Sequence, residues 1–362
     1  MKSYCWDNKG KEETEKYEFV KKYAEWIENP RQGKCPYSDP DEVNNNINYV
    51  KNSEFYKALT VFLKCSKEKI QESCGFVLEF KEPTNLEDES RKMPGDRTIT
   101  VQKDENDYLY LTSDQFGFSA ISNENQTWSP LKYPYAIYER CYKGDKSLIG
   151  DTIWYSRTIG GSFLWPKADQ KGWSSLYNTN RGVNSYIEDR VDLTLYEIKE
   201  YLDYRNKRKQ GLDKEKPINN LLFNVIEDAE KKEASACKNC KDKDECDKDK
   251  CHKVEGNELQ KWFSLFENFE TYVKIFCFDA FVKKEEDGIY YPRDLFTGES
   301  IKENDIKKYR DKNDEKYKFI QKKASKGELE NAFCNLIKWT KDRSKKMEEW
   351  IELGNRTNSK EQ

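Results

Sequence analysis

Four cysteines and one histidine in a short, highly charged stretch are the residues of this sequence with the clearest chemical signature. They are Cys237, Cys240, Cys246, Cys251 and His252. Structural zinc sites hold the metal tetrahedrally with four Cys or His ligands, and a Cys-x2-Cys pair supplies two of them from one turn. Cys246 with Cys251, or with His252, completes the set. The segment is too polar to build a core of its own, so we expect a zinc ion to stabilise it directly.

Two alternatives to zinc stay open for this cluster. The Cys-x2-Cys-x5-Cys spacing is similar to the iron–sulfur site of some nucleases, although those nucleases use a distant fourth cysteine. Free thiols in an extended loop are the second alternative. A structural zinc uses every local ligand and implies no open coordination position, so we expect the metal to be structural rather than catalytic.

A second group of candidate residues lies between Gly150 and Tyr204, where a predicted strand, two adjacent glycines and a predicted helix follow one another. Backbone N–H groups at Gly160 and Gly161, together with the guanidinium of Arg157, suit a phosphate-binding turn. A β-bulge or a tight turn between strands explains the same glycines without any ligand.

More polar residues follow the glycines and precede the predicted helix. Arginine forks match the geometry of phosphate and carboxylate, so Arg181 and Arg190 are candidate ligand-binding residues, with Asn178 orienting the ligand. Carboxylates beside such a pocket are suited to proton transfer. The candidate catalytic residues are Asp189, Asp192 and Glu197. The alternative is a buried salt-bridge network that fixes residues 167–192 to the helix start, where Asp192 favours the helix dipole.

Asp279 and a set of aromatic residues are weaker candidates. Asp279 lies in an apolar stretch, where it either pairs with one of the arginines above or has a raised pKa and a catalytic role. The aromatic residues are suited either to stacking on nucleic-acid bases or to packing in a core. They are Trp165, Trp173, Tyr177 and Tyr186.

Composition excludes several classes of enzyme. The chain of 362 residues has a single histidine. Away from His252 it therefore has no Ser-His-Asp or Cys-His pair and no site with two histidine ligands. The 64 basic and 67 acidic residues leave a net charge of −3, so no strongly basic domain indicates non-specific duplex binding.

The sequence indicates a cytoplasmic protein. No apolar run reaches the roughly 18 residues that span a bilayer, and the first residues lack the apolar core of a signal peptide. We therefore expect no membrane association. In a reducing compartment the 11 cysteines are reduced thiols or metal ligands rather than disulfides.

The elements that must position these residues follow from hydrophobic periodicity. Helices are predicted over residues 13–29, 53–64, from Thr194 onward, 217–231, 257–282 and 328–353. Strands are predicted over residues 75–80, 97–102, 107–112, 116–122, 133–142, 152–155, 162–165 and 290–295. The predicted fold class is α+β, with an antiparallel sheet packed against N-terminal, central and C-terminal helices and with a small zinc-binding insertion.

Capping signals suggest where two of the helices begin. Ser185-x-x-Glu188 and Thr194-x-x-Glu197 compete for one start, and we favour the second. Ser325-x-x-Glu328 begins the last helix and Gly354 ends it.

The domain organisation follows from these elements. Residues 1–230 and 257–354 form a single α+β domain. Residues 231–256 are the cysteine-rich metal-binding insertion, and residues 355–362 are a disordered tail.

The segment from Arg157 to Ile198 resembles an uncharacterised bacterial family, a domain of unknown function. Its pattern R-T-I-G-G matches residues 157–161, an N-x-x-R-G block matches residues 178–182, and D-R-x-D-L-T-L matches residues 189–195. A later aromatic block resembles residues 265–273, so the resemblance covers residues 100–310. It implies a small intracellular accessory protein of prokaryotes or phages, with a role in phage–host conflict, and it implies no reaction.

Two functions remain. The first, which we favour, is a zinc-containing binding protein that engages a protein or nucleoprotein partner, with nucleic acid as a further candidate. The second is an enzyme acting on a nucleotide or nucleic acid, metal-independent or carboxylate-based, through Arg157, Arg181, Asp189 and Arg190. An open pocket formed by these residues would favour the enzyme, and mutual ion pairing under aromatic residues would favour binding.

Overall fold

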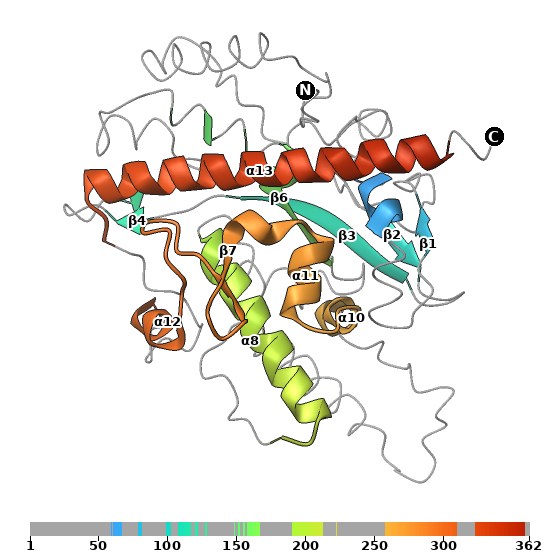
Figure 1. Cartoon of the computed structure of the whole chain (residues 1–362), viewed down its shortest axis with the longest axis horizontal. Helices are drawn as coiled ribbons and strands as arrows, with labels where there is room; N and C mark the ends of the chain where they lie inside the picture. Colours follow the sequence, from blue (N-terminus) through green and yellow to red (C-terminus); the bar gives the residue numbers. More distant parts are fainter. Residues whose placement is uncertain are drawn as a thin grey trace, which may run out of the picture.

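The structure is a computed structural model of the whole chain, coloured along the sequence in Figure 1. It describes residues 59, 61–66, 79–81, 99–102, 108–116, 120–121, 127–128, 148, 151–152, 155, 158–166, 190–212, 222, 258–309 and 323–358.

A four-stranded antiparallel sheet is the largest sheet in this part of the chain. Its strands are β1 (Glu79–Lys81), β2 (Ile99–Gln102), β3 (Tyr108–Gln115) and β6 (Ser162–Pro166), in the order β1-β2-β3-β6. In the β3–β6 pair, Leu111 lies opposite Pro166 and Gln115 opposite Ser162. The predicted antiparallel sheet is confirmed, and the predicted strands over 75–80, 97–102, 107–112 and 162–165 overlap these four, the first of them only at residues 79–80.

Two small hairpins accompany the sheet. One pairs β4 (Ala120–Ile121) with β5 (Thr127–Trp128), and the other pairs β7 (Val282–Lys284) with β8 (Tyr290–Pro292). The predicted strand over 116–122 is therefore confirmed only at residues 120–121, and the one over 290–295 at residues 290–292.

Five helices and two 3-10 turns of the described fold have defined bounds. They are α8 (Val191–Lys209), α10 (Glu258–Ser264), α11 (Phe269–Ile275), α12 (Glu303–Tyr309) and α13 (Lys326–Asn358), with 3-10 turns η3 (Ile159–Gly161) and η6 (Phe278–Phe281). In Figure 1, α13 runs horizontally across the molecule and contacts η3 and η6, whereas α8 descends away from it. The fold class is therefore α+β, as predicted.

Aromatic side chains join the sheet to α13. Phe116 at the end of β3 lies 4.9 Å, between ring centroids, from Phe163 of β6. Phe163 lies 5.1 Å from Phe278 of η6, and Phe281 lies 5.6 Å from Trp339 of α13. All five rings are buried, so the core is continuous from the sheet through η6 to the last helix.

The predicted single helix over residues 257–282 is wrong. The chain forms α10, α11 and η6 instead, because two residues interrupt it. The Asn268 side chain accepts a hydrogen bond of 2.8 Å from the Thr271 N–H, which caps the start of α11. Cys277 takes a left-handed conformation with φ of 56°, which separates α11 from η6. In one continuous helix the aromatic residues of this segment would lie on several faces. The breaks between α10, α11 and η6 allow all of these faces to reach the core.

The predicted strand over residues 152–155 is also wrong. Leu148, Asp151, Thr152 and Tyr155 are helical, and Thr152 donates its hydroxyl hydrogen to the Leu148 carbonyl at 2.8 Å. Four residues are too few to distinguish a strand from a turn of buried helix by periodicity.

The predicted helix start at Thr194 lies three residues too late. α8 begins at Val191, and Thr194 donates from its hydroxyl to the Arg190 carbonyl within the first turn. The apolar residues at helical spacing face the core, since Leu195, Ile198, Tyr201 and Leu202 are all buried.

The last helix begins as predicted and ends later. The Ser325 N–H donates to the Glu328 carboxylate at 2.9 Å, and the Glu328 N–H donates to the Ser325 hydroxyl at 3.3 Å, which is the predicted capping box. The predicted end at Gly354 is wrong because α13 continues to Asn358. A single glycine costs a helix only about 1 kcal/mol, so it does not force an end.

Other expectations fall mostly outside the described residues. Leu59 and Phe62 are helical and buried, as expected for the helix over 53–64. The predicted helix over 13–29, the strand over 133–142 and the insertion over 231–256 lie outside the described part of the chain.

None of the helices described is both long enough and apolar enough to cross a membrane.

Candidate functional site

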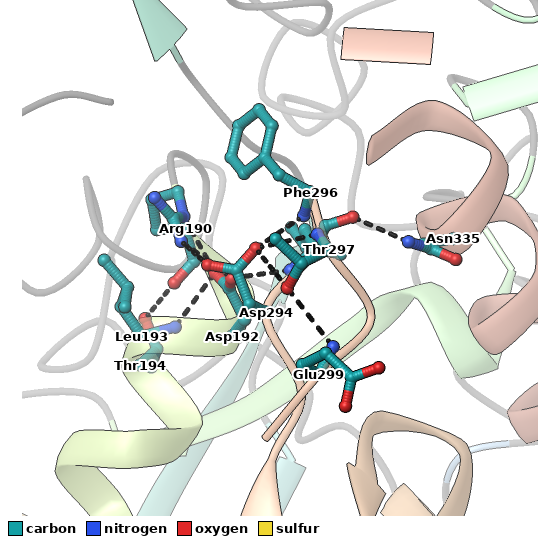
Figure 2. Close-up of polar contacts among 10 residues, drawn as sticks. Arg190, Asp192, Leu193, Thr194, Asp294, Phe296, Thr297, Glu299 and Asn335 are labelled. Atoms are coloured by element: carbon teal, nitrogen blue, oxygen red, sulfur yellow. Dashed lines mark hydrogen bonds and ion pairs between the residues drawn. The ribbon is translucent and has the colours of Figure 1, made fainter. Parts of the chain in front are cut away.

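Arg190 and Asp192 form the centre of the candidate site, at the start of α8 (Figure 2). The Arg190 guanidinium donates from Nε to Asp192 Oδ1 at 2.9 Å and from Nη2 to Asp192 Oδ2 at 2.8 Å. This bidentate pair is the strongest geometry that the two groups can adopt. Arg190 is 4% exposed and Asp192 is 1% exposed. The pair is therefore part of the interior.

The loop after β8, 104 residues further along the chain at Asp294, supplies the other half of this cluster. Arg190 Nη2 also lies 3.4 Å from Asp294 Oδ2, and the Leu295 N–H donates to Asp192 Oδ2 at 2.9 Å. Asp294 Oδ1 accepts the N–H groups of Phe296 at 2.8 Å and Thr297 at 3.0 Å. The Phe296 ring lies 5.1 Å from the guanidinium carbon of Arg190. The carboxylates of Asp192 and Asp294 thus bind the guanidinium of Arg190, and both also accept backbone N–H groups of the loop.

α13 anchors the same loop. Asn335 donates from Nδ2 to the Leu295 carbonyl at 2.8 Å. Arg293 donates from Nε to the Gly298 carbonyl at 2.9 Å, and its guanidinium lies 4.6 Å from the centre of a Trp339 ring. The Arg190 cluster therefore ties together α8, the loop after β8 and the last helix.

Gly160 and Gly161 lie in η3, where both are buried, and η3 packs against α13. A Cβ atom at Gly160 would lie 2.4 Å from the Ser344 backbone nitrogen, so only glycine fits there. The Gly161 N–H donates to the Thr158 carbonyl at 2.9 Å, and the Thr158 and Ser344 hydroxyls bond at 2.8 Å. These contacts are those of a tight turn that packs against a helix. They support the structural alternative over the phosphate-binding one.

Arg343 is a buried residue that sequence reasoning missed. It donates from Nε to the Phe276 carbonyl and from Nη1 to the Gly160 carbonyl, both at 2.8 Å. The guanidinium carbon lies 4.0 Å from the centre of the Phe278 ring and 5.2 Å from that of Phe116. Burial lowers the pKa of Arg343 to about 10, so the side chain remains charged at neutral pH.

The sequence held a signal for Arg343. It lies four residues after Trp339 and four before Met347, both buried, so the helical period places it on the apolar face of α13. Burial also raises the pKa of the neighbouring Tyr272 hydroxyl. Asp294 offered no comparable signal, because its charged partner, Arg190, is 104 residues away along the chain.

Glu197 and Asp279 have roles of their own. Glu197 is 3% exposed, and its Oε2 accepts the Leu222 N–H at 3.1 Å. Asp279 is exposed and pairs with Lys346 at 2.5 Å. Among the described residues Asp279 therefore pairs with Lys346 and not with Arg190, while Arg157 and Arg181 lie outside the described part of the chain.

Several predicted site residues lie outside the described part of the chain. They are Arg157, Asn178, Arg181, Asp189, Cys237, Cys240, Cys246, Cys251 and His252. The same is true of three aromatic candidates, Trp173, Tyr177 and Tyr186. Of Trp165 only the backbone is described, in β6. Among the residues that are described, no group of three or more His, Cys, Asp or Glu could hold a metal ion.

Comparison with curated proteins found no match, and comparison with solved structures found none either. A family model does match. The match confirms the expected resemblance to an uncharacterised family, and it ends before the aromatic block at residues 265–273. It covers η3, β6 and α8, with Gly160, Gly161, Arg190 and Asp192 inside it. Residues 89–225 of this chain match DUF6994, a family of unknown function.

Proposed function

We propose that this protein is a zinc-containing binding protein that engages a protein or nucleoprotein partner. The observation that carries the proposal is that the Arg190 guanidinium is already paired. The enzymatic alternative requires this guanidinium to bind a phosphate group. Asp192 already occupies the Arg190 fork, and Phe296 lies 5.1 Å from it. A phosphate would have to displace a buried bidentate carboxylate, which is strongly unfavourable.

The carboxylates near Arg190 are also engaged. Asp192 accepts from Arg190 and from the Leu295 N–H, and Glu197 accepts from the Leu222 N–H. A general base needs a free oxygen within reach of a substrate proton. Both of these acids are buried among protein groups, which favours a structural role for them and a function at the protein surface.

Zinc completes the proposal. Cys237, Cys240, Cys246 and Cys251, with His252 as an alternative ligand, would form a closed structural site in the 231–256 insertion. Such a lobe would present a rigid surface from an otherwise polar segment to a partner. A role in phage–host conflict, in the cytoplasm, is the setting that the family resemblance suggests.

Metal analysis and partner capture test this function together. The protein is purified from cells without a histidine tag, and its zinc and iron contents are measured per chain. We expect about one zinc and no iron. Cys237→Ser together with Cys240→Ser should abolish zinc retention and weaken capture of the co-purifying partner, without loss of the folded α+β domain.

Cys334→Ser is the matched control, because Cys334 is an exposed thiol on α13. That variant should keep both zinc and partner. Wild-type protein that contains no metal would overturn the zinc site, and stoichiometric iron would replace it with an iron–sulfur cluster. A catalytic turnover of nucleotide or nucleic acid that is lost on Arg190→Lys would overturn the binding function.

A further inference from the structure

The last turn of α8 carries three consecutive basic residues, Lys207, Arg208 and Lys209, all of them exposed. Within the described part of the chain, none of the three side chains has a hydrogen bond or an ion pair. This differs from Lys199 earlier in the same helix, which pairs with Asp203 at 2.5 Å. We define these three residues, with the exposed Leu212 that follows, as the basic tip of α8.

The basic tip is held rigidly on the fold. Arg205 lies just before it and donates to the carbonyl oxygens of Phe263 and Phe266 and, at 3.1 Å, to that of Glu267. These carbonyls lie at the end of α10 and just beyond it, so the guanidinium fastens α8 to the end of α10. In Figure 1 the C-terminal end of α8 lies farther from α13 than its N-terminal end does. The tip therefore projects from an anchored helix.

Helix capping does not explain the three charges. The N–H of Gly211, which has φ of 69°, donates to the Arg208 carbonyl at 3.1 Å. The Leu212 N–H donates to the Lys207 carbonyl at 3.0 Å. These two bonds form a Schellman motif, which satisfies the last carbonyl groups of the helix with backbone donors. The lysine and arginine side chains are left for other contacts.

The arrangement of the charges indicates the kind of ligand. Successive helical residues are rotated by about 100° from one another, since 3.6 residues make one turn. The three cations therefore diverge around the helix end, whereas a site for one small anion needs donors that converge. Leu212, which is 55% exposed, adds an apolar contact at the same place. A polyanion that lies across the helix end would meet all of these groups.

We propose that the basic tip of α8 binds the phosphate backbone of a nucleic acid. This inference rests on the proposed function and specifies the nucleic-acid part of a nucleoprotein partner. Nucleic acid is the polyanion of highest charge density, and Lys and Arg release its condensed counterions when they neutralise phosphates. The Arg208 fork matches a phosphate bidentately, and Leu212 contacts sugar or base.

Binding of a labelled single-stranded oligonucleotide, and of the matching duplex, tests the proposal across about 50 to 200 mM salt. The variant is Lys207→Ala/Arg208→Ala/Lys209→Ala in the full-length protein. We expect at least about a tenfold loss of affinity at low salt. The slope of log K against log salt should fall in magnitude by about 2, because each single-strand phosphate neutralised contributes about 0.7.

Lys338→Ala/Lys341→Ala/Lys345→Ala is the matched control, since it removes three exposed cations from α13 and changes net charge equally. It should keep nearly wild-type affinity. An equal loss in both variants, or no oligonucleotide binding by wild-type protein, overturns the proposal. So does binding to phosphatidylserine vesicles or to polyglutamate that equals or exceeds oligonucleotide binding and depends on the tip.

Capture of the partner after nuclease treatment separates this inference from the proposed function. If the tip variant captures the partner as well as wild type does, and binds the oligonucleotide unchanged, the basic tip is not a nucleic-acid site. The proposed binding function then still stands on the partner and on zinc.

Discussion

Gly160 and Ser344 are in closer contact than any side chain at position 160 would permit. A Cβ atom built on Gly160 lies 2.3 Å from the Ser344 Oγ, 2.4 Å from its backbone nitrogen and 2.7 Å from its Cα. Real Cβ contacts do not fall below about 3.0 Å. Because two of the three atoms are backbone, a change of rotamer cannot relieve the clash. Gly160 therefore permits the close approach of α13 to η3.

Gly160→Ala should destabilise the protein strongly. The added methyl group must push α13 away from η3, which also strains the Arg343 bond to the Gly160 carbonyl. Overpacking of this kind costs typically about 1–3 kcal/mol, and we expect the upper end. Gly327→Ala is the control, because nothing lies within 4 Å of its Cβ position in the first turn of α13. It should be neutral or stabilise by about 0.5–1 kcal/mol. Chemical denaturation of both variants measures the difference, and equal stabilities would contradict the close contact.

Asp192→Asn should cost about 3–5 kcal/mol, because it leaves the buried Arg190 charge without its bidentate partner. Asp294, at 3.4 Å, compensates only in part. Glu270→Gln, which breaks the exposed Glu270–Lys274 pair on α11, should cost no more than about 0.5 kcal/mol. Urea unfolding with a double-mutant cycle against Arg190→Met measures the coupling. A small cost at Asp192 would mean that the buried pair does not organise this region.

The regular elements followed from local pattern where that pattern was long or capped. The sheet strands alternate and are bounded by turn residues, and the Ser325–Glu328 box identified the start of α13. The breaks at Asn268 and Cys277 could not be predicted in the same way. A left-handed cysteine has no sequence signal, and the aromatic residues around it fit a continuous helix equally well. Tertiary packing therefore decides between one continuous helix and the separate elements α10, α11 and η6.

The candidate site was half predictable. Arg190 and Asp192 stood out as charged residues at a helix start, and a buried network was one of two alternatives for them. The partner Asp294 could not be found, because its carboxylate is brought in by the hairpin of β7 and β8 from a distant segment. The basic tip of α8 was hidden for another reason. Its residues look like ordinary helix-end cations until the Schellman bonds show that backbone groups already cap the helix.

Arg343→Met should lower stability by about 2–4 kcal/mol, although methionine fills a similar volume and suits a helix. The substitution leaves the Phe276 and Gly160 carbonyls without their buried donors, and it removes a cation that contacts two aromatic rings. Arg343→Lys should recover little, since one ammonium group cannot reproduce two separate guanidinium bonds. Thermal unfolding and tyrosine fluorescence of both variants test this. Lysine rescue to wild-type stability would show that charge alone matters at this position.

Glu348→Gln should stabilise the protein at neutral and alkaline pH. Burial raises the pKa of Glu348 in α13 to about 7, and Glu349 and Glu352 add to the shift. The unfolded chain ionises near pH 4.3, so between about pH 4.3 and 7 the native state holds more protons than the unfolded state. Stability from this group is fully present below that range and is lost as pH rises through 7. Glutamine stays neutral throughout, so the free energy of unfolding of the variant should match that of wild type near pH 4 and exceed it by roughly 1–3 kcal/mol at pH 8.

Asp342→Asn, at an exposed site on the same helix, should leave the pH profile of unfolding parallel to that of wild type. A Glu348→Gln profile that is also parallel would mean that Glu348 is ionised in the native state at pH 5 to 7, and that its burial in α13 is incomplete.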